Sequence, residues 1–94
     1  MACKRGHILV AEDSIDTQNL LSLYIKRTGA KVSFANNGRQ AVEMAIANTY
    51  NLVFMDMQMP EIDGIEATKT LRQIGFSKPI IAFTASTPYN KWNA

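Results

Sequence analysis

The sequence has little cysteine, little net charge and no long apolar run, and each shortage argues against a class of protein. Cys3 is the only cysteine among 94 residues, so an intrachain disulfide is impossible and a reducing compartment is expected. No apolar run approaches the roughly 18 residues that a membrane span needs, and the first residues do not resemble a secretory signal. The net charge is only +2, and lysine and arginine are scattered along the chain. We therefore expect a cytoplasmic protein with neither a membrane nor a nucleic-acid partner.

The composition is typical of one small domain with a large apolar share. Hydrophobic residues make up 47% of the chain and charged residues 19%, against about 25% charged residues in ordinary domains. A chain of this length buries only about 60–65% of its unfolded surface. Either the core is dense or apolar surface lies against a partner. We expect a single domain over residues 1–94, in which 86–94 form an irregular tail because they show no period.

Short apolar runs alternate with helix-period segments along the chain. Runs near 7–12, 51–56 and 79–84 have the length of strands and are apolar on both faces, as in a covered parallel sheet. A weaker alternating run at 31–35 suits an edge strand. Helical stripes occur near 20–25, 41–46 and 63–74, and Gly29 and Gly75 follow the first and third as stop signals. This alternation predicts βαβ units, a parallel sheet and right-handed crossovers.

Acidic residues follow two of the predicted strands. Glu12 and Asp13 end the first strand, and Asp56 ends the third. In open parallel sheets the ligand site lies beyond the carboxyl ends of the strands, so these side chains converge if the two strands are neighbours. A divalent cation would offset their mutual repulsion, and an oxygen-only ligand set favours Mg²⁺ over Zn²⁺. A carboxylate can also be a nucleophile that forms an aspartyl-phosphate. The plainer alternative is that all three are solvated loop residues.

Four segments together resemble the receiver domains of response regulators. They are ILVAEDS at 8–14, NNGRQA at 36–41, DMQMPEIDG at 56–64 and AFTA at 82–85. The resemblance covers about residues 7–85, and the segment after Asp56 is similar to receivers attached to hybrid sensor histidine kinases. It implies a flavodoxin-like α/β fold, a three-layer sandwich whose parallel sheet has the order 2-1-3-4.

The resemblance also implies a role for each matched residue. Asp56 would accept a phosphoryl group from a phosphohistidine on a histidine kinase or phosphotransfer domain. Asp13 and Asp56 would bind Mg²⁺, with Glu12 acting directly or through a water, and the backbone carbonyl of Gln58 would complete the metal ligands. Thr84 would hydrogen-bond a phosphoryl oxygen and move as the switch.

The sequence departs from the family pattern after Thr84. Receivers normally continue with a helix, a fifth strand, which carries a phosphate-contacting lysine, and a final helix, whereas ten residues follow Thr84 here. Neither Lys78 nor Lys91 matches that lysine, so we expect an incomplete receiver domain that lacks the last β-α unit. The strand at 79–84 would then be an apolar edge open to pairing. We expect a homodimer through this edge, because two-fold dimers are the commonest closed assembly.

Two functions remain open at this point, and a third is weaker. The first is a phosphoacceptor domain of a two-component phosphorelay, whose only enzymatic activity would be self-phosphorylation from a phosphodonor and slow autodephosphorylation. The alternative is a non-switching interaction or dimerisation module that keeps the receiver fold without the family lysine. A free-standing hydrolase with a similar acidic site is disfavoured because no general base or substrate pocket is evident in the sequence.

Overall fold

The structure is a computed structural model that describes residues 6–57 and 63–83. Strands and helices alternate strictly within these ranges. The elements are β1 (His7–Ala11), α1 (Ile15–Arg27), β2 (Lys31–Ala35), α2 (Gly38–Ala47), β3 (Leu52–Asp56), α3 (Gly64–Gln73) and β4 (Ile80–Phe83). Each strand and helix predicted from the sequence is present. Residues 86–94, for which we predict an irregular tail, lie outside the described ranges.

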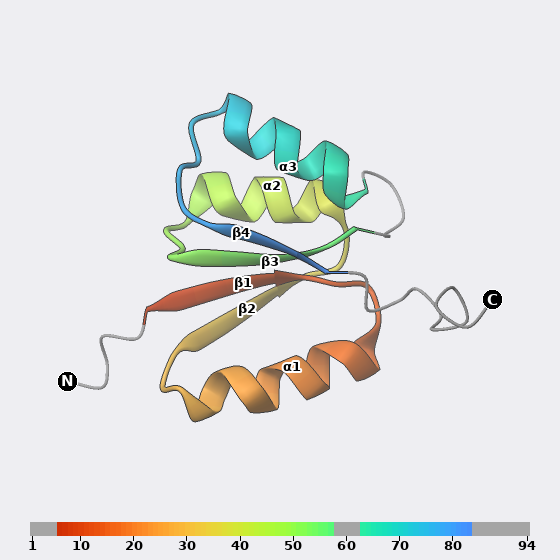
Figure 1. The fold of residues 1–94 in the computed structure, drawn as a ribbon, viewed down its shortest axis with the longest axis vertical. Coiled ribbons are helices and arrows are strands. Elements are labelled where there is room, and N and C mark those ends of the chain that lie inside the picture. Colours follow the sequence, from red (N-terminus) through yellow and green to blue (C-terminus); the bar gives the residue numbers. More distant parts are fainter. Residues whose placement is uncertain (1–5, 58–62, 84–94) are drawn as a thin grey trace.

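The four strands form one parallel sheet in the order β2-β1-β3-β4. Helix α1 covers one face of this sheet, and α2 and α3 cover the other (Figure 1). The prediction of a three-layer α/β sandwich with strand order 2-1-3-4 is therefore confirmed. β2 lies at one edge of the sheet, as its alternating pattern predicted.

The central strands supply a core on each face of the sheet because their side chains alternate in direction. Leu9 of β1 and Met55 of β3 are fully buried in the larger core, which contacts α2 and α3. Val10 points the other way, into the smaller core with Ile25 of α1. The neighbouring β1 and β3 are thus fixed from both sides, which also fixes the positions of the residues that follow them.

Each helix begins with a polar side chain that satisfies a backbone N–H left free in its first turn. The three caps and their donors are Ser14 with Thr17 N at 3.4 Å, Asn37 with Gln40 N at 2.8 Å, and Asp63 with Glu66 N at 2.9 Å. Gly29 and Gly75 follow the ends of α1 and α3 with φ of 89° and 98°. Both are therefore the predicted stop signals, in a conformation that glycine adopts without steric cost.

Strand β4 pairs with β3, and among the described residues it has no neighbour on its other side. Ile81 at its centre is 45% exposed, although its partner in register is the half-buried Phe54. Within 6–57 and 63–83, no helix has both the length and the apolar character required to cross a bilayer.

Candidate functional site

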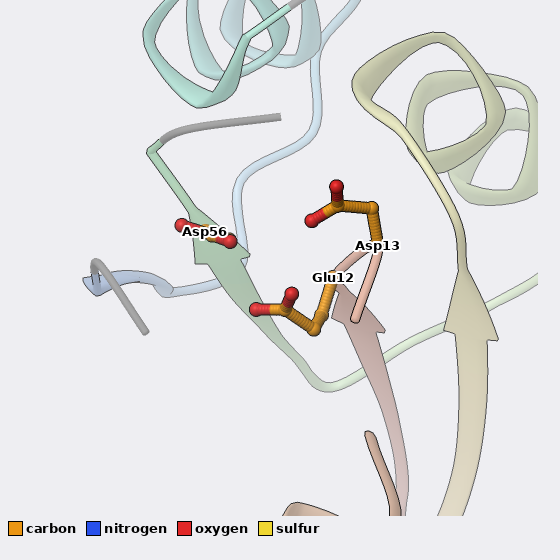
Figure 2. Close-up of side chains that lie close together, drawn as sticks. All are labelled: Glu12, Asp13 and Asp56. Atoms are coloured by element: carbon orange, nitrogen blue, oxygen red, sulfur yellow. The ribbon is translucent and has the colours of Figure 1, made fainter. Parts of the chain in front are cut away.

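Three carboxylates meet at the carboxyl ends of β1 and β3. Ala11 is in register with Met55, so Glu12 and Asp56 come next on adjacent strands, and Asp13 follows directly. One carboxylate oxygen from each of Glu12, Asp13 and Asp56 lies within 4.8 Å of the others. Figure 2 shows the three side chains directed into one space between the two strand ends. The predicted convergence is confirmed, and the alternative that all three are solvated loop residues is wrong, because Glu12 and Asp56 are buried.

The three residues differ in their access to solvent. Glu12 and Asp56 are 0% exposed, whereas Asp13 is exposed. The cluster therefore has a buried floor and one side open to water. A small ion or a phosphodonor could approach from the Asp13 side without any rearrangement of the sheet.

Among the described residues, only one of the two carboxylate oxygens of Glu12 accepts a hydrogen bond. The backbone N–H of Ser14 donates to its Oε2 at 2.7 Å. Its Oε1 is buried and has no hydrogen-bond partner among the described residues. Burial, assisted by the nearby carboxylates of Asp56 and Asp13, raises the pKa of Glu12 to about 8 against the opposing effect of the Ser14 N–H. Without a cation, Glu12 therefore holds a proton near neutral pH.

These features fit a hard divalent cation. All the donors are oxygens, which Mg²⁺ prefers, and Mg²⁺ needs only one or two carboxylates in addition to water and phosphate oxygens. The buried Glu12 Oε1, which has no hydrogen-bond partner among the described residues, has lone pairs available, and Glu12 offers one carboxylate oxygen to the cluster. A bound cation would also favour the ionised form of Glu12, because opposite charge lowers a carboxyl pKa.

Gln18, on the inward face of α1, holds the loop that carries the two acids after β1. Its side chain is buried, and its Nε2 donates to the Glu12 carbonyl at 2.6 Å and to Asn36 Oδ1 at 3.0 Å. The Glu12 N–H donates to the Ala35 carbonyl at 2.9 Å. Gln18 was not predicted from the sequence as a site residue. Its spacing in the sequence could have indicated this role. Gln18 precedes the inward-facing Leu21 by three residues and Ile25 by seven, so it lies on the buried face of the helix, where an apolar residue is expected.

The Asp56 end of the site is held by α3 and β4. The Met57 N–H donates to the Phe83 carbonyl at 2.7 Å, which ties the residue after Asp56 to β4. Gly64 begins α3 against the Asp56 backbone, and a Cβ there would overlap the Asp56 carbonyl oxygen and lie 2.7 Å from Met57 Cα. A side chain at position 64 would displace the backbone on which the Asp56 carboxylate depends.

Two of the predicted site residues, Gln58 and Thr84, lie outside the described residues. The metal-ligand role of the Gln58 carbonyl and the phosphoryl contact of Thr84 therefore stay predictions. Lys78 precedes β4, and its carbonyl accepts from Arg72 Nη1 at 2.9 Å. It therefore lies before the strand rather than at the carboxyl end, where the acids gather.

Comparison with known proteins identifies the family. The family model described as response regulator receiver domain matches residues 8–92. The chain is 38% identical over 66 residues to hybrid signal transduction histidine kinase K of Dictyostelium discoideum, covering 70% of this chain and 5% of that protein. It is 36% identical over 80 residues to the transcriptional regulatory protein SrrA of Staphylococcus aureus, covering 85% of this chain and 33% of SrrA. The chain thus spans a third or less of the length of these relatives.

Solved structures agree with this assignment. The receiver domain of the Francisella response regulator 1452 has a TM-score of 0.81 and 27% identity, over 95% of this chain and 74% of that one. Response regulator TrrA of Thermotoga maritima, solved in complex with Mg²⁺ and BeF, has a TM-score of 0.81 and 30% identity, over 90% of this chain and 74% of TrrA. Given this match and the acidic cluster beyond β1 and β3, the chain belongs to the response regulator receiver domain family.

Proposed function

We propose that this chain is the phosphoacceptor of a two-component phosphorelay and that Asp56 takes the phosphoryl group. The observation that carries the proposal is the meeting of Glu12, Asp13 and Asp56 in one cluster, in which Glu12 and Asp56 are buried and Asp13 is exposed. Family membership supports it, as does TrrA, which was solved with Mg²⁺ and BeF and is 30% identical to this chain.

The proposed reaction is a phosphoryl transfer from nitrogen to oxygen. An Asp56 carboxylate oxygen forms the new P–O bond as the P–N bond of the donor phosphohistidine breaks, and the freed imidazole nitrogen takes up a proton. The product is an acyl phosphate on Asp56. Such a transfer needs positioning and charge neutralisation more than covalent help from the protein. The hydrogen bonds from Gln18 Nε2 to the Glu12 carbonyl and from the Met57 N–H to the Phe83 carbonyl supply the positioning.

In this proposal Asp13 and Asp56 hold Mg²⁺, with Glu12 as a direct or water-mediated ligand and the Gln58 carbonyl as a further one. When bound, the cation neutralises the negative charge that gathers on the phosphoryl oxygens and the carboxylates. The residues' own contributions differ. Asp56 is the nucleophile, Asp13 faces the solvent side where a donor arrives, and Glu12 sets the charge of the buried floor. Thr84 would contact a phosphoryl oxygen.

The proposed donor is a histidine kinase or a histidine phosphotransfer protein. TrrA has also been solved in complex with the histidine kinase ThkA, and that structure has a TM-score of 0.79 and 30% identity to this chain. A cytoplasmic location is part of the same proposal, since a chain with a single cysteine fits the reducing compartment in which such donors are expected. The homodimer through β4 stays a prediction. It is supported by the exposure of Ile81 and by the lack of a second neighbour for β4 among the described residues.

Intact-mass analysis with a small phosphodonor tests the proposal. The chain is incubated with acetyl phosphate and Mg²⁺, and we expect a mass increase of one phosphoryl group that disappears in Asp56→Asn and after chelation of Mg²⁺. Asp63→Asn is the matched control, because it changes an exposed carboxylate to an equally good helix cap. Absence of the adduct in wild-type protein, under conditions that label another receiver, would contradict the proposal and favour the non-switching interaction module.

A further inference from the structure

Helix α1 carries apolar side chains on the face turned away from the sheet. Its inward face is made by Gln18, Leu21 and Ile25, which pack against β1 and β2 or hold the site loop. On the opposite face, Leu20 is 52% exposed and Leu23 is 66% exposed. Figure 1 shows α1 as the outermost element on its side of the sheet. A soluble helix normally presents polar residues there, so an apolar outer stripe indicates a contact surface.

The outer stripe is flanked by one charge of each sign. The charges and the two leucines lie along a single helical seam, because they are spaced four, three and four residues apart: Asp16, Leu20, Leu23 and Arg27. Asp16 lies in the first turn of α1 and Arg27 in the last, and both are exposed. Among the described residues, neither Asp16 nor Arg27 forms an ion pair. Tyr24, 60% exposed, widens the stripe beside Leu20.

This order of residues is self-complementary when the helix meets a second copy of itself in the antiparallel direction. The midpoint between Asp16 and Arg27 falls between residues 21 and 22, and so does the midpoint between Leu20 and Leu23. A two-fold axis at that point places Leu20 of each copy on Leu23 of the other. The same axis places Asp16 of each copy beside Arg27 of the other, at both ends of the seam. A parallel pairing would instead put like charges together.

We propose that the outer face of α1 is a homodimer surface, in which two α1 helices pack antiparallel with Leu20 and Leu23 at the centre and Asp16 and Arg27 paired at the ends. This surface is separate from the β4 edge and does not depend on phosphoryl transfer. A helix of 13 residues is about 20 Å long, so the interface is at the low end of specific contacts. The dimer is therefore weak and reversible, and forms at micromolar to millimolar concentration.

Sedimentation velocity of the full 94-residue chain, from about 10 µM to about 1 mM, tests the proposal. Wild-type protein should show concentration-dependent dimerisation that Leu23→Arg abolishes. Ile46→Arg is the matched control, since Ile46 is also 66% exposed but lies on α2, and it should leave dimerisation unchanged. Ile81→Lys separates this surface from the predicted β4 dimer: association through α1 should persist in Ile81→Lys and be abolished when Leu23→Arg is added.

A charge exchange tests the antiparallel geometry. Asp16→Arg should weaken dimerisation about tenfold, because both weak end pairs become like-charge contacts. Adding Arg27→Asp to the same chain should restore wild-type affinity, since the pairs re-form with reversed signs. These residues are exposed, so the exchange remains informative even if Leu23→Arg fails to fold.

Three results would overturn the proposal. The first is a wild-type chain that remains monomeric up to about 1 mM, which would indicate that the outer face of α1 binds a different helical partner. The second is a Leu23→Arg variant that associates as wild type does, which would place the interface elsewhere. The third is a double exchange that associates no better than Asp16→Arg alone, which would exclude the antiparallel pairing.

Discussion

Glu12→Gln should stabilise the protein in the absence of a divalent cation, and the effect should grow with pH. The folded chain raises the pKa of Glu12 from 4.5 to about 8, chiefly by burial. Each pKa unit is worth about 1.4 kcal/mol, so the ionised side chain opposes folding by up to about 5 kcal/mol above pH 8. Glutamine has the same shape, can still accept from the Ser14 N–H, and carries no charge to desolvate.

The direction of the pH dependence follows from proton binding. Between pH 4.5 and about 8 the folded state keeps the Glu12 proton while the unfolded state has lost it. The free energy of unfolding therefore falls as pH rises through this window, by up to about 1.4 kcal/mol per pH unit. Glu12→Gln removes this slope. The variant should match wild type near pH 4.5 and exceed it by about 3 kcal/mol near pH 7.

Urea unfolding of both proteins in EDTA, at several pH values from 4.5 to 8, measures this difference. Glu43→Gln is the control, because it makes the same substitution at an exposed position on α2. Addition of Mg²⁺ should stabilise wild type more than the variant, since a cation that binds the folded state shifts the unfolding equilibrium toward it. Equal pH slopes for wild type and Glu12→Gln without metal would refute the assignment of a strained, buried carboxyl at this position.

Two further substitutions test the backbone that holds the site. Gly64→Ala should destabilise the fold by about 1–3 kcal/mol, because the new Cβ overlaps the Asp56 carbonyl oxygen, and it should also lower phosphoryl uptake. Gly75→Ala places a Cβ in open space at a φ of +98°, so it should lower stability without lowering phosphoryl uptake. Equal losses of phosphoryl uptake in Gly64→Ala and Gly75→Ala would contradict the contact between Gly64 and the Asp56 backbone. Gln18→Leu should cost about 1–3 kcal/mol in urea unfolding by leaving the buried Glu12 carbonyl without its donor, and a neutral result would show that Gln18 does not hold the loop.

The fold could be predicted because local patterns and strand-end chemistry agree. Apolar runs of strand length, the stop signals Gly29 and Gly75, and the acids after two runs all appear in the structure where the sequence placed them. The meeting of Glu12 and Asp56 depends on β1 and β3 being neighbours, and periodicity alone does not determine strand order. It was the resemblance to receivers that predicted the order 2-1-3-4, and the structure confirms it.

The buried face of each helix was predicted less well than the helix itself. The stripe predicted near 20–25 divides in the structure, with Leu21 and Ile25 directed inward and Leu20 and Tyr24 exposed. A helix that is apolar on two sides does not show which side meets the sheet, since either gives the same period. Gln18 was missed for the related reason that its contact with the Glu12 carbonyl depends on tertiary packing.

The most direct measurement of the central claim is a calorimetric titration of Mg²⁺ into wild type, Asp13→Asn and Asp56→Asn near pH 7. If Glu12, Asp13 and Asp56 hold one cation together, wild type binds one Mg²⁺ per chain, and each variant binds at least tenfold more weakly, the equivalent of about 1.4 kcal/mol. Binding should also release a proton, seen as a dependence of the heat on the buffer, because the cation ionises Glu12. Affinity that is the same in wild type and both variants would show that the three carboxylates are not the cation site.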